Sequence, residues 1–379
     1  MYNLKEGVYF DNAASTKPII GVLEVLNKIC NEGYGNPSSA HSVGIRAETA
    51  ITESKAAISE LLDVSPDEII FTSGGTEANN MAVFGISESF KRSGNHIITT
   101  KTEHPSVTAP VKLLEQKGYE VTYLDVCDKG YVKADDLQGA MREDTILVSI
   151  HHVNSETGTI QNISELAKNV KSKNPNTIFH CDGVQAFGKI PISLKNIDLY
   201  SISGHKIHCI KGIGGLYVKK GLKIAPLILG GGHQGGLRGG TENSMGAAAF
   251  RVAAVDAYSN MSASRQKVLE VKSRLSKIAD GERIIINGDP ENSSPYILSM
   301  SFLGKKGEVL LRYLDDKGVY VSTGSACNER KKNSSGLMHF GYSKDRVASA
   351  VRFSFSRFNT VQEADYCAEV LEGALERLV

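Results

Sequence analysis

Helical patterns alternate with short apolar runs over the middle of the chain, from about residue 47 to residue 220. The runs are rich in β-branched residues and lie at 68–72, 96–100, 120–124, 145–151, 178–182, 199–203 and 214–218. Apolar strands that alternate with helices are typical of βα units around a parallel sheet with both faces covered. The sequence therefore predicts an α/β fold with a mainly parallel seven-stranded sheet covered by helices.

The pattern changes after a glycine-rich stretch at 230–240. Two helices are expected at about 245–278, followed by strands and helices at 283–287, 297–302, 306–316, 319–322, 351–356 and from 361 onward. A chain of 379 residues is long for one hydrophobic core and suits one large and one small domain. We expect residues 15–260 to form the large domain, and residues 1–14 with 261–379 to form a smaller α+β domain.

Composition excludes several classes of protein. Lys and Arg total 43 against 42 Asp and Glu, so no strong field favours nucleic acid or a membrane surface. No apolar run approaches the ~20 residues that span a bilayer, and the first residues do not resemble a signal peptide. The 6 cysteines are scattered without a C-x-x-C pair, which argues against a disulfide framework and a structural zinc site. We expect a cytoplasmic protein without membrane or direct nucleic-acid partners.

Polar residues follow several of the expected strands. Two glycines in 71–79 stand where a strand gives way to a helix, and glycine lets backbone N–H groups approach an anion at the positive helix N-terminus. Gly75 and Thr76 are therefore candidate phosphate ligands, although a helix-capping box explains the same residues. His104 and Asp182 also follow strand ends, where ligands of open α/β sheets bind, but each could be an ordinary loop or helix-cap residue.

Lys206 ends another strand pattern, in Ser203-Gly204-His205-Lys206. Most lysines are simply solvated, but desolvation and a neighbouring cation make such an amine a nucleophile toward an aldehyde. Pyridoxal 5'-phosphate (PLP) requires an anion site for its phosphate, a carboxylate for its ring nitrogen and an amine for its aldehyde. The combination at the strand ends of one sheet predicts a PLP site.

These motifs resemble those of class V aminotransferase-like enzymes of PLP fold type I, and within them the group I (NifS/IscS-type) cysteine desulfurases. The resemblance covers nearly the whole chain and includes the motifs at 9–14, 35–39, 72–77, 102–104, 156–158, 182–185, 238–241 and 352–354, with Ser203-Gly204-His205-Lys206 and Gly324-Ser325-Ala326-Cys327. The pair Gly-His-Lys and Gly-Ser-Ala-Cys is its most specific part. The resemblance implies the PLP-dependent transferase fold.

The resemblance also implies how the cofactor is held. Lys206 would bind the cofactor aldehyde covalently, His104 would stack on the ring and transfer protons, and Asp182 would pair with the ring nitrogen. The remaining implied contacts are Gln185 and Asn154 toward the ring hydroxyl and the substrate, Gly75, Thr76, Ser203 and His205 on the phosphate, and Thr241 from the second subunit of a homodimer.

The implied reaction converts L-cysteine to L-alanine and leaves a persulfide on Cys327. Arg352 would bind the substrate carboxylate, for which a bidentate guanidinium is suited. Cys327 lies in a polar, Gly- and Ser-rich stretch at 322–336, expected to be a mobile loop that carries sulfur to an acceptor. An Fe–S scaffold and a tRNA-thiolation enzyme are the expected kinds of acceptor. Cys209, in an apolar setting, is expected to be unreactive.

Three departures from the family pattern and several alternatives accompany this interpretation. Cys209-Ile210 stands where Gly-Pro is usual and is expected to change the loop after Lys206, whereas Ser155 and Gly183 replace the usual Asn and Ala. The alternatives are a selenocysteine lyase or another class V enzyme, and a non-catalytic partner subunit of the same fold. A metal site formed by His205, His208 and Cys209 lacks further ligands at the usual spacing.

Overall fold

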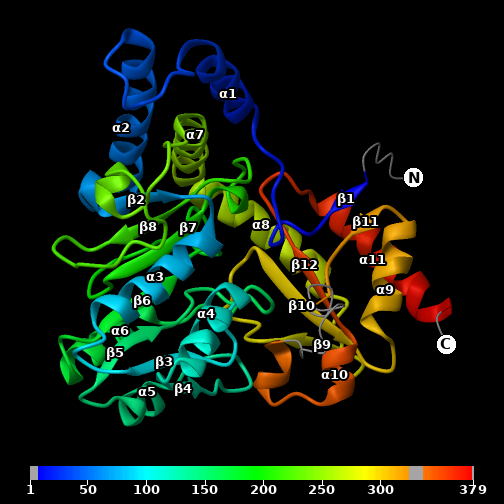
Figure 1. The fold of residues 1–379 in the computed structure, drawn as a ribbon. Helices are drawn as coiled ribbons and strands as arrows, with labels where there is room; N and C mark the ends of the chain where they lie inside the picture. Colours follow the sequence, from blue (N-terminus) through cyan, green and yellow to red (C-terminus); the bar gives the residue numbers. More distant parts are fainter. Residues whose placement is uncertain (1–6, 324–335, 378–379) are drawn as a thin grey trace.

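The computed structural model describes residues 7–323 and 336–377, and its larger part is built around a seven-stranded sheet (Figure 1). The strands, in spatial order, are β2 (Ile69–Thr72), β8 (Gly214–Val218), β7 (Leu199–Ser203), β6 (Ile178–Asp182), β5 (Thr145–Ser149), β3 (His96–Thr100) and β4 (Glu120–Leu124). β8 runs antiparallel to both of its neighbours, and the other neighbouring pairs are parallel. The predicted α/β fold class is confirmed.

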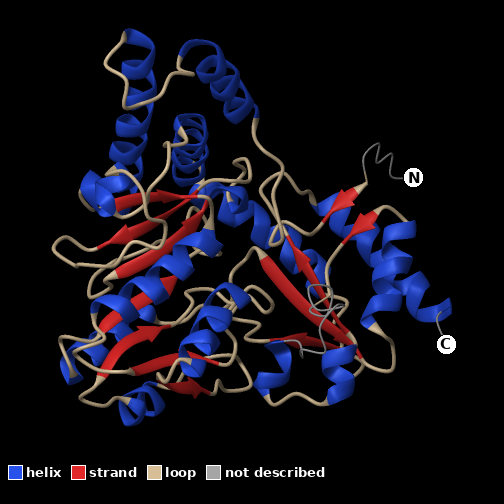
Figure 2. Cartoon of the chain, in the orientation of Figure 1, coloured by secondary structure: helices blue, strands red, loops and turns tan. Residues whose placement is uncertain are grey.

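Helices cover both faces of this sheet (Figure 2). Successive residues of a strand point to opposite faces, so in β2 Ile69 and Phe71 pack in one hydrophobic core while Ile70 packs in another. Helices α3 (Gly75–Ser89) and α4 (Pro105–Gln116) supply the core around Ile70. The opposite core receives residues from α1 (Ile20–Glu32), α2 (Ser42–Leu62), α5 (Ala134–Ala140), α6 (Ile163–Lys173) and α7 (Ser244–Ser259).

The second part of the molecule contains a three-stranded antiparallel sheet of order β12-β10-β9 and a separate hydrophobic core. Its elements are α8 (Met261–Ser276), β9 (Ile284–Asn287), β10 (Ile297–Phe302), α9 (Gly307–Asp316), β11 (Val319–Tyr320), α10 (Lys344–Ala348), β12 (Ala350–Ser354) and α11 (Val361–Arg377). We propose that these elements form the smaller α+β domain.

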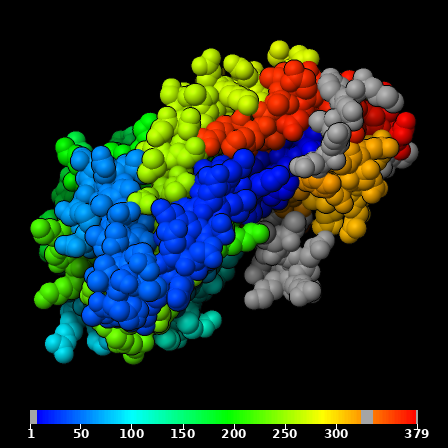
Figure 3. Space-filling view, turned by 90° about the horizontal axis from the view of Figure 1, so that it is seen from above, coloured from blue at the N-terminus to red at the C-terminus, as the bar shows by residue number. Residues whose placement is uncertain are grey.

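The N-terminal segment joins this smaller unit. Strand β1 (Val8–Tyr9) pairs in parallel with β11, and Val8 and Phe10 are fully buried in the core of the smaller unit. Figure 3 shows the blue N-terminal chain lying against the red and orange C-terminal part. These contacts support the proposed division into residues 15–260, and residues 1–14 with 261–379.

The structure differs from the sequence pattern in detail. β5 ends at Ser149 rather than at residue 151, and β12 spans Ala350–Ser354 rather than 351–356, although Phe355 N still donates to Tyr296 O. Helix α1 was not predicted. Within the described ranges, we find no helix long and apolar enough to cross a membrane.

Candidate active site

The carboxyl ends of four strands bring the predicted site residues to one edge of the large sheet. Asp182 is the last residue of β6, Ser203 is the last residue of β7, and Lys206 ends the short 3-10 turn that follows. Gly75 begins α3 just after β2, and His104 is the N-cap of α4 just after β3. Because β2, β3, β6 and β7 run in the same direction, these ends meet where α/β sheets bind ligands.

The start of α3 forms a cradle against Ser203. A Cβ at Gly75 would lie 2.5 Å from Val184 Cγ2 and 3.6 Å from Ser203 Cβ, so only glycine allows this approach. The Ser203 hydroxyl is buried and has no hydrogen-bond partner among the described residues. Buried hydroxyls are normally hydrogen-bonded, so a bound anion at the helix N-terminus would satisfy this one.

The same turn does not form the capping box that the sequence offered as an alternative, because the N-cap of α3 is Gly74 and no side chain caps it. Glu77 Oε2 accepts a hydrogen bond of 2.8 Å from Ser73 N, and Glu77 Oε1 accepts one of 2.9 Å from Arg238 Nε. Thr76 is exposed, and His205 is half-buried. Burial, and then the positive charge of Lys206, lowers the pKa of His205 to about 4, so its imidazole is neutral near pH 7.

One amide connects Asp182 with His104. Asn79 Nδ2 donates to Asp182 Oδ2 and to Ser106 Oγ, both at 2.8 Å, and Val184 N donates to Asp182 Oδ1 at 3.0 Å. Ser106 Oγ lies 2.7 Å from His104 Nδ1, which also accepts from Ser106 N at 3.1 Å. Since Nδ1 accepts from the backbone, the ring proton of neutral His104 lies on Nε2.

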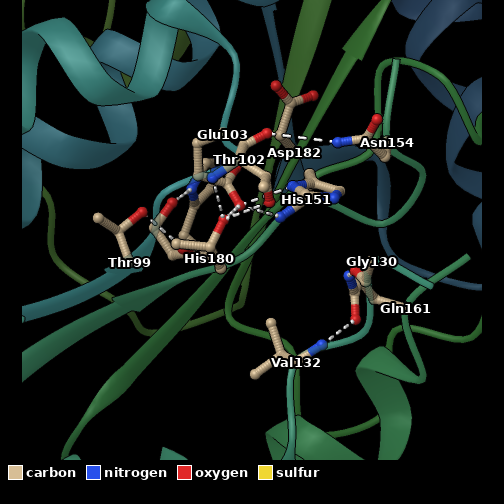
Figure 4. A network of polar contacts seen from close by, with 12 residues as sticks. Thr99, Thr102, Glu103, Gly130, Val132, His151, Asn154, Gln161, His180 and Asp182 are labelled. Atoms are coloured by element: carbon tan, nitrogen blue, oxygen red, sulfur yellow. Dashed lines mark hydrogen bonds and ion pairs between the residues drawn. The ribbon is translucent and has the colours of Figure 1, made fainter. Parts of the chain in front are cut away.

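His104 is solvent-accessible although protein surrounds its ring closely. Burial lowers its pKa, Asp182 opposes that shift, and the charge of Lys206 adds to it. Next to it, Glu103 Oε1 contacts His151 Nδ1 at 2.7 Å, and both side chains are buried (Figure 4). Burial opposes the charge on each, but the partner outweighs it, so the pKa of Glu103 is lowered and that of His151 is raised.

Lys206 faces the N-terminal segment. Its Nζ donates to Ala13 O at 2.6 Å and to Ala14 O at 2.9 Å. Gln185 Nε2 donates to the same Ala13 carbonyl at 2.9 Å, and Gln185 Oε1 accepts from Lys189 Nζ at 2.9 Å. Two candidate site residues therefore share one backbone acceptor.

The loop after Lys206 contains the unusual Cys209. His208 has a positive φ of 68°, and its backbone N–H donates to Thr16 Oγ1 at 2.7 Å. Cys209 is buried, and burial raises its pKa to about 12. The thiol of Cys209 is therefore not ionised near neutral pH.

Arg352 connects the two parts of the molecule. Its Nη1 donates to Ser155 O and its Nη2 to Asp11 Oδ1, both at 2.9 Å, while its buried Nε has no partner among the described residues. Asn154 shapes the neighbouring loop, since its Oδ1 accepts from Glu156 N and Thr157 N at 2.9 Å.

Cys327 lies outside the described residues, but the chain on either side of it reaches this region. Ser322 and Arg352 exchange backbone hydrogen bonds of 3.1 and 2.7 Å. Gly336 N donates to Glu156 Oε1 at 3.3 Å. Thr241 is exposed, three residues after the Arg238 that pairs with Glu77.

Sequence reasoning missed Asn79, Ser106, Lys189 and Asp11 as parts of the site. Asn79 stands one helical turn after Gly75, which was the available signal. Lys189 follows Gln185 by four residues, but nothing in the sequence indicates that its amine is buried. Among residues 7–323 and 336–377, no three His, Cys, Asp or Glu side chains lie together in a way that could hold a metal ion.

The residues present fit PLP. The buried Ser203 hydroxyl and the start of α3 suit its phosphate, the buried Asp182 carboxylate suits a protonated ring nitrogen, and the Lys206 amine suits its aldehyde. A comparison with protein families bears on the same point, because the aminotransferase class-V model matches residues 8–367. The chain belongs to this family. PLP is the cofactor of the class V aminotransferases, and this protein is a PLP-dependent enzyme.

Several relatives of this class V aminotransferase family member are named for one activity. A protein named cysteine desulfurase IscS from Dictyoglomus turgidum is 39% identical over 383 residues, which cover 99% of this chain and 96% of the relative. A putative cysteine desulfurase IscS 1 from Bacillus subtilis is 39% identical over 98% of this chain and 100% of its own length. The resemblance to NifS/IscS-type proteins is confirmed.

Solved structures agree with this placement. A NifS-like protein superposes with a TM-score of 0.93 at 38% identity and covers 98% of this chain and 100% of its own. The NifS-like protein from Rickettsia africae superposes with a TM-score of 0.88 at 28% identity, covering 98% of this chain and 99% of its own.

Proposed function

We propose that this class V aminotransferase is a cysteine desulfurase, which releases the sulfur of L-cysteine as a persulfide on Cys327 and forms L-alanine. The observation that carries the proposal is the convergence of Lys206, Asp182 and Ser203 at the edge of the large sheet. The names of the full-length relatives supply the substrate, since they are called cysteine desulfurases.

The residues around the cradle hold the cofactor. The N-terminus of α3 at Gly75 and Thr76, with Ser203 and His205, binds the phosphate.

Asp182 keeps the ring nitrogen protonated, because Asn79 and Val184 fix both of its carboxylate oxygens. When bound and so protonated, PLP withdraws electrons from the Cα–H bond of the substrate.

Two nitrogen atoms move protons. Lys206 Nζ, which donates to the carbonyl oxygens of Ala13 and Ala14, binds the cofactor and then takes the α-proton of the substrate. His104 presents its Nε2–H toward the open side of the site, because Nδ1 is occupied by Ser106. Its lowered pKa keeps the imidazole neutral near pH 7, so Nε2 can donate and later recover a proton.

Arg352 and Asn154 bind the substrate. Arg352 is already oriented by Asp11 and Ser155 O, and its unpartnered Nε adds a donor for a carboxylate. Asn154 fixes the loop that faces Arg352, and Gln185 contributes an amide on the Ala13 side.

Cys327 is the proposed sulfur acceptor within the chain. It stands four positions after Thr323, and four extended residues span at most about 14 Å. Ser322 pairs with Arg352, which supports a thiol within reach of the bound substrate. Cys209 is a poor alternative, because its buried thiol has a raised pKa.

The assembly and the destination of the sulfur belong to the same proposal. A homodimer in which Thr241 reaches the phosphate of the other subunit follows from the family resemblance, and the exposure of Thr241 is compatible with such a contact. We propose a cytoplasmic enzyme that passes sulfur to an acceptor protein, such as an Fe–S scaffold or a tRNA-thiolation enzyme.

Alanine release by two cysteine variants tests the proposed function. Cys327→Ser should bind PLP and L-cysteine but release no alanine in the steady state, whereas Cys209→Ser should keep most of the activity because its thiol is not ionised. Borohydride reduction followed by mass spectrometry should find the pyridoxyl group on Lys206, and Lys206→Ala should lose both the label and turnover.

Two outcomes would contradict the proposal. Inactive Cys209→Ser beside active Cys327→Ser would show that the wrong thiol has been assigned. A pyridoxyl group on another lysine would show that Lys206 does not hold the cofactor.

A further inference from the structure

Lys189 is a lysine in the interior of the protein, beside the candidate active site. It is 7% exposed and follows Asp182 by seven residues. Among the described residues no carboxylate forms an ion pair with it. A buried ammonium without a counter-ion is costly, so the position calls for an explanation other than stability.

The amine of Lys189 contacts Gln185. Its Nζ donates to Gln185 Oε1 at 2.9 Å and lies 5.8 Å from the centroid of the Tyr296 ring. The other end of the same amide, Gln185 Nε2, donates to Ala13 O at 2.9 Å. Lys206 Nζ donates to that carbonyl as well, at 2.6 Å. The Gln185 amide therefore links Lys189 to the backbone carbonyl that Lys206 also contacts.

The chemistry of an ammonium group fixes the orientation of this amide. In its protonated form Lys189 has three donors and no lone pair, so below its lowered pKa only the oxygen of Gln185 can face it. The Nε2 group then faces Ala13 O, the carbonyl that also accepts from Lys206 Nζ. With an apolar residue at position 189, the Ala13 carbonyl would remain as a contact that orients the amide, so the flipped orientation, with an acceptor toward the cofactor, would cost less free energy.

The groups around Lys189 destabilise its charged form. Burial, followed by the charges of Lys206 and Arg352, lowers its pKa to about 7. Lys189 and Lys206 also line a cavity of about 30 Å³, enough for a water molecule. The other titratable or charged groups that line this cavity are His208, Asp256, Tyr296 and Arg357. Asp256 is already paired with Arg357, so it does not compensate Lys189.

We propose that Lys189 is a positioning residue that holds the Gln185 amide with its N–H groups toward Lys206 and the PLP ring. This proposal rests on the proposed function, since it assumes that PLP occupies the site. A donor on that side stabilises the anionic ring oxygen of bound PLP.

PLP binding to a mutant cycle tests this role. The apoproteins of the parent, Lys189→Met, Gln185→Ala and the double variant are titrated with PLP, and the pH midpoint of the visible cofactor band is measured on each loaded protein. Lys189→Met should weaken PLP binding about three- to tenfold, the range for one net hydrogen bond, and should shift the midpoint in the same direction as Gln185→Ala. The double variant should match Gln185→Ala alone, because Lys189 acts through that amide.

Gln185→Glu gives a second test that leaves Lys189 in place. The carboxylate still accepts from Lys189 but has no N–H to present, so PLP binding should weaken as in Gln185→Ala. Lys272→Met is the matched control, because Lys272 is another poorly solvated lysine whose Nζ bonds to Ser293 Oγ and Ser294 O. It should leave both measurements unchanged.

Several results would overturn the role of Lys189. Additive effects of Lys189→Met and Gln185→Ala, or parent-like PLP binding by Gln185→Glu, would show that the amide orientation does not matter. A Lys189→Met protein with a lower Tm and parent-like PLP binding would make the lysine structural. If the parent protein itself binds no PLP, the proposed function is wrong, a result distinct from these three.

Discussion

Asn79 shows how one side chain can set the chemistry of two others. Its amide donates to Asp182 and to Ser106, which in turn occupies His104 Nδ1. Without this amide, Asp182 Oδ2 would lose a hydrogen-bond donor, and Ser106, which helps to fix the tautomer of His104, would lose its contact with Asn79. Asp182 and His104, the two groups proposed to handle charge and protons at this site, are thus coupled by hydrogen bonds rather than by direct contact.

The buried Glu103–His151 pair gives the protein a defined pH dependence of stability. The lowered pKa of Glu103 means that its contribution is complete above 4.5 and is lost as the pH falls further. The raised pKa of His151 means that its contribution is complete below 6.5 and is lost as the pH rises through the raised value. The stabilisation by this pair is therefore greatest between these two values.

We predict that Glu103→Gln lowers the free energy of unfolding of the apoprotein by about 3 to 5 kcal/mol near pH 6, because it leaves the charge of His151 buried without its partner. The difference between variant and parent should shrink as the pH rises through the raised pKa of His151, where the imidazole of the parent loses its proton. Urea denaturation of both proteins at a series of pH values measures it.

Glu53→Gln is the control, since the Glu53–Arg251 pair is half exposed and should contribute less than about 1 kcal/mol at either pH. A Glu103→Gln difference that is constant with pH would show that His151 is not charged in the folded protein.

At the scale of elements, the site depends on how closely β6 and β7 approach each other. Gly183 follows β6, and a Cβ there would lie 2.0 Å from Cε1 of the Tyr200 ring. Tyr200 is fully buried, and its hydroxyl lies 2.8 Å from His152 Nδ1. Gly183 in place of the family's usual alanine is therefore matched to the large neighbour at position 200.

We predict that Gly183→Ala lowers the free energy of unfolding by about 1 to 3 kcal/mol or more, because the buried ring cannot move aside freely. It should also weaken PLP binding, since Gly183 lies between Asp182 and Val184, whose N–H donates to that carboxylate. Tyr200→Leu should relieve much of the effect. The double variant should therefore lose less unfolding free energy than the two single variants lose together.

Gly139→Ala provides the control for this prediction. Nothing lies within 4 Å of a Cβ at Gly139, which is inside helix α5, so alanine there should be neutral or stabilising by up to about 1 kcal/mol. If Gly183→Ala is as harmless as Gly139→Ala, Tyr200 does not restrict position 183.

The strand ends were predictable because their chemistry is local in sequence. Asp182, Ser203 and Gly75 each stand directly at the end of an apolar run or the start of the following helix, so a linear pattern locates them. Lys189 was not predictable, because its burial depends on residues from distant segments, such as Tyr296. Asp11 was missed for the same reason, since its partner Arg352 is 341 residues away.

At the scale of the whole molecule, several exposed apolar side chains lie on the N-terminal helices, on the loop between them and on the glycine-rich segment. They are Ile20, Leu23, Tyr34, Ile45 and Leu229, and their exposed fractions lie between 50 and 82%. Contiguous exposed apolar patches often mark an interface with another chain. These positions support the proposed homodimer, in which Thr241 would contact the phosphate site of the partner subunit.

Mixed dimers test whether Thr241 acts within its own subunit or across the interface. Lys206→Ala and Thr241→Ala proteins each lose tight PLP binding when pure, the second by on the order of tenfold or more for a hydrogen bond to a charged group. If Thr241 crosses the interface, a dimer with one subunit of each kind has one site that combines both defects and one site that is intact. We therefore predict that mixing and reassociating the two proteins restores parent-like PLP affinity in the mixed dimers, with the pyridoxyl label on Lys206 of the Thr241→Ala subunit.

Sedimentation should show dimers throughout. Mixed dimers that retain the weak affinity of Thr241→Ala would place Thr241 in its own subunit's site, and a fully active monomer would exclude the shared site altogether.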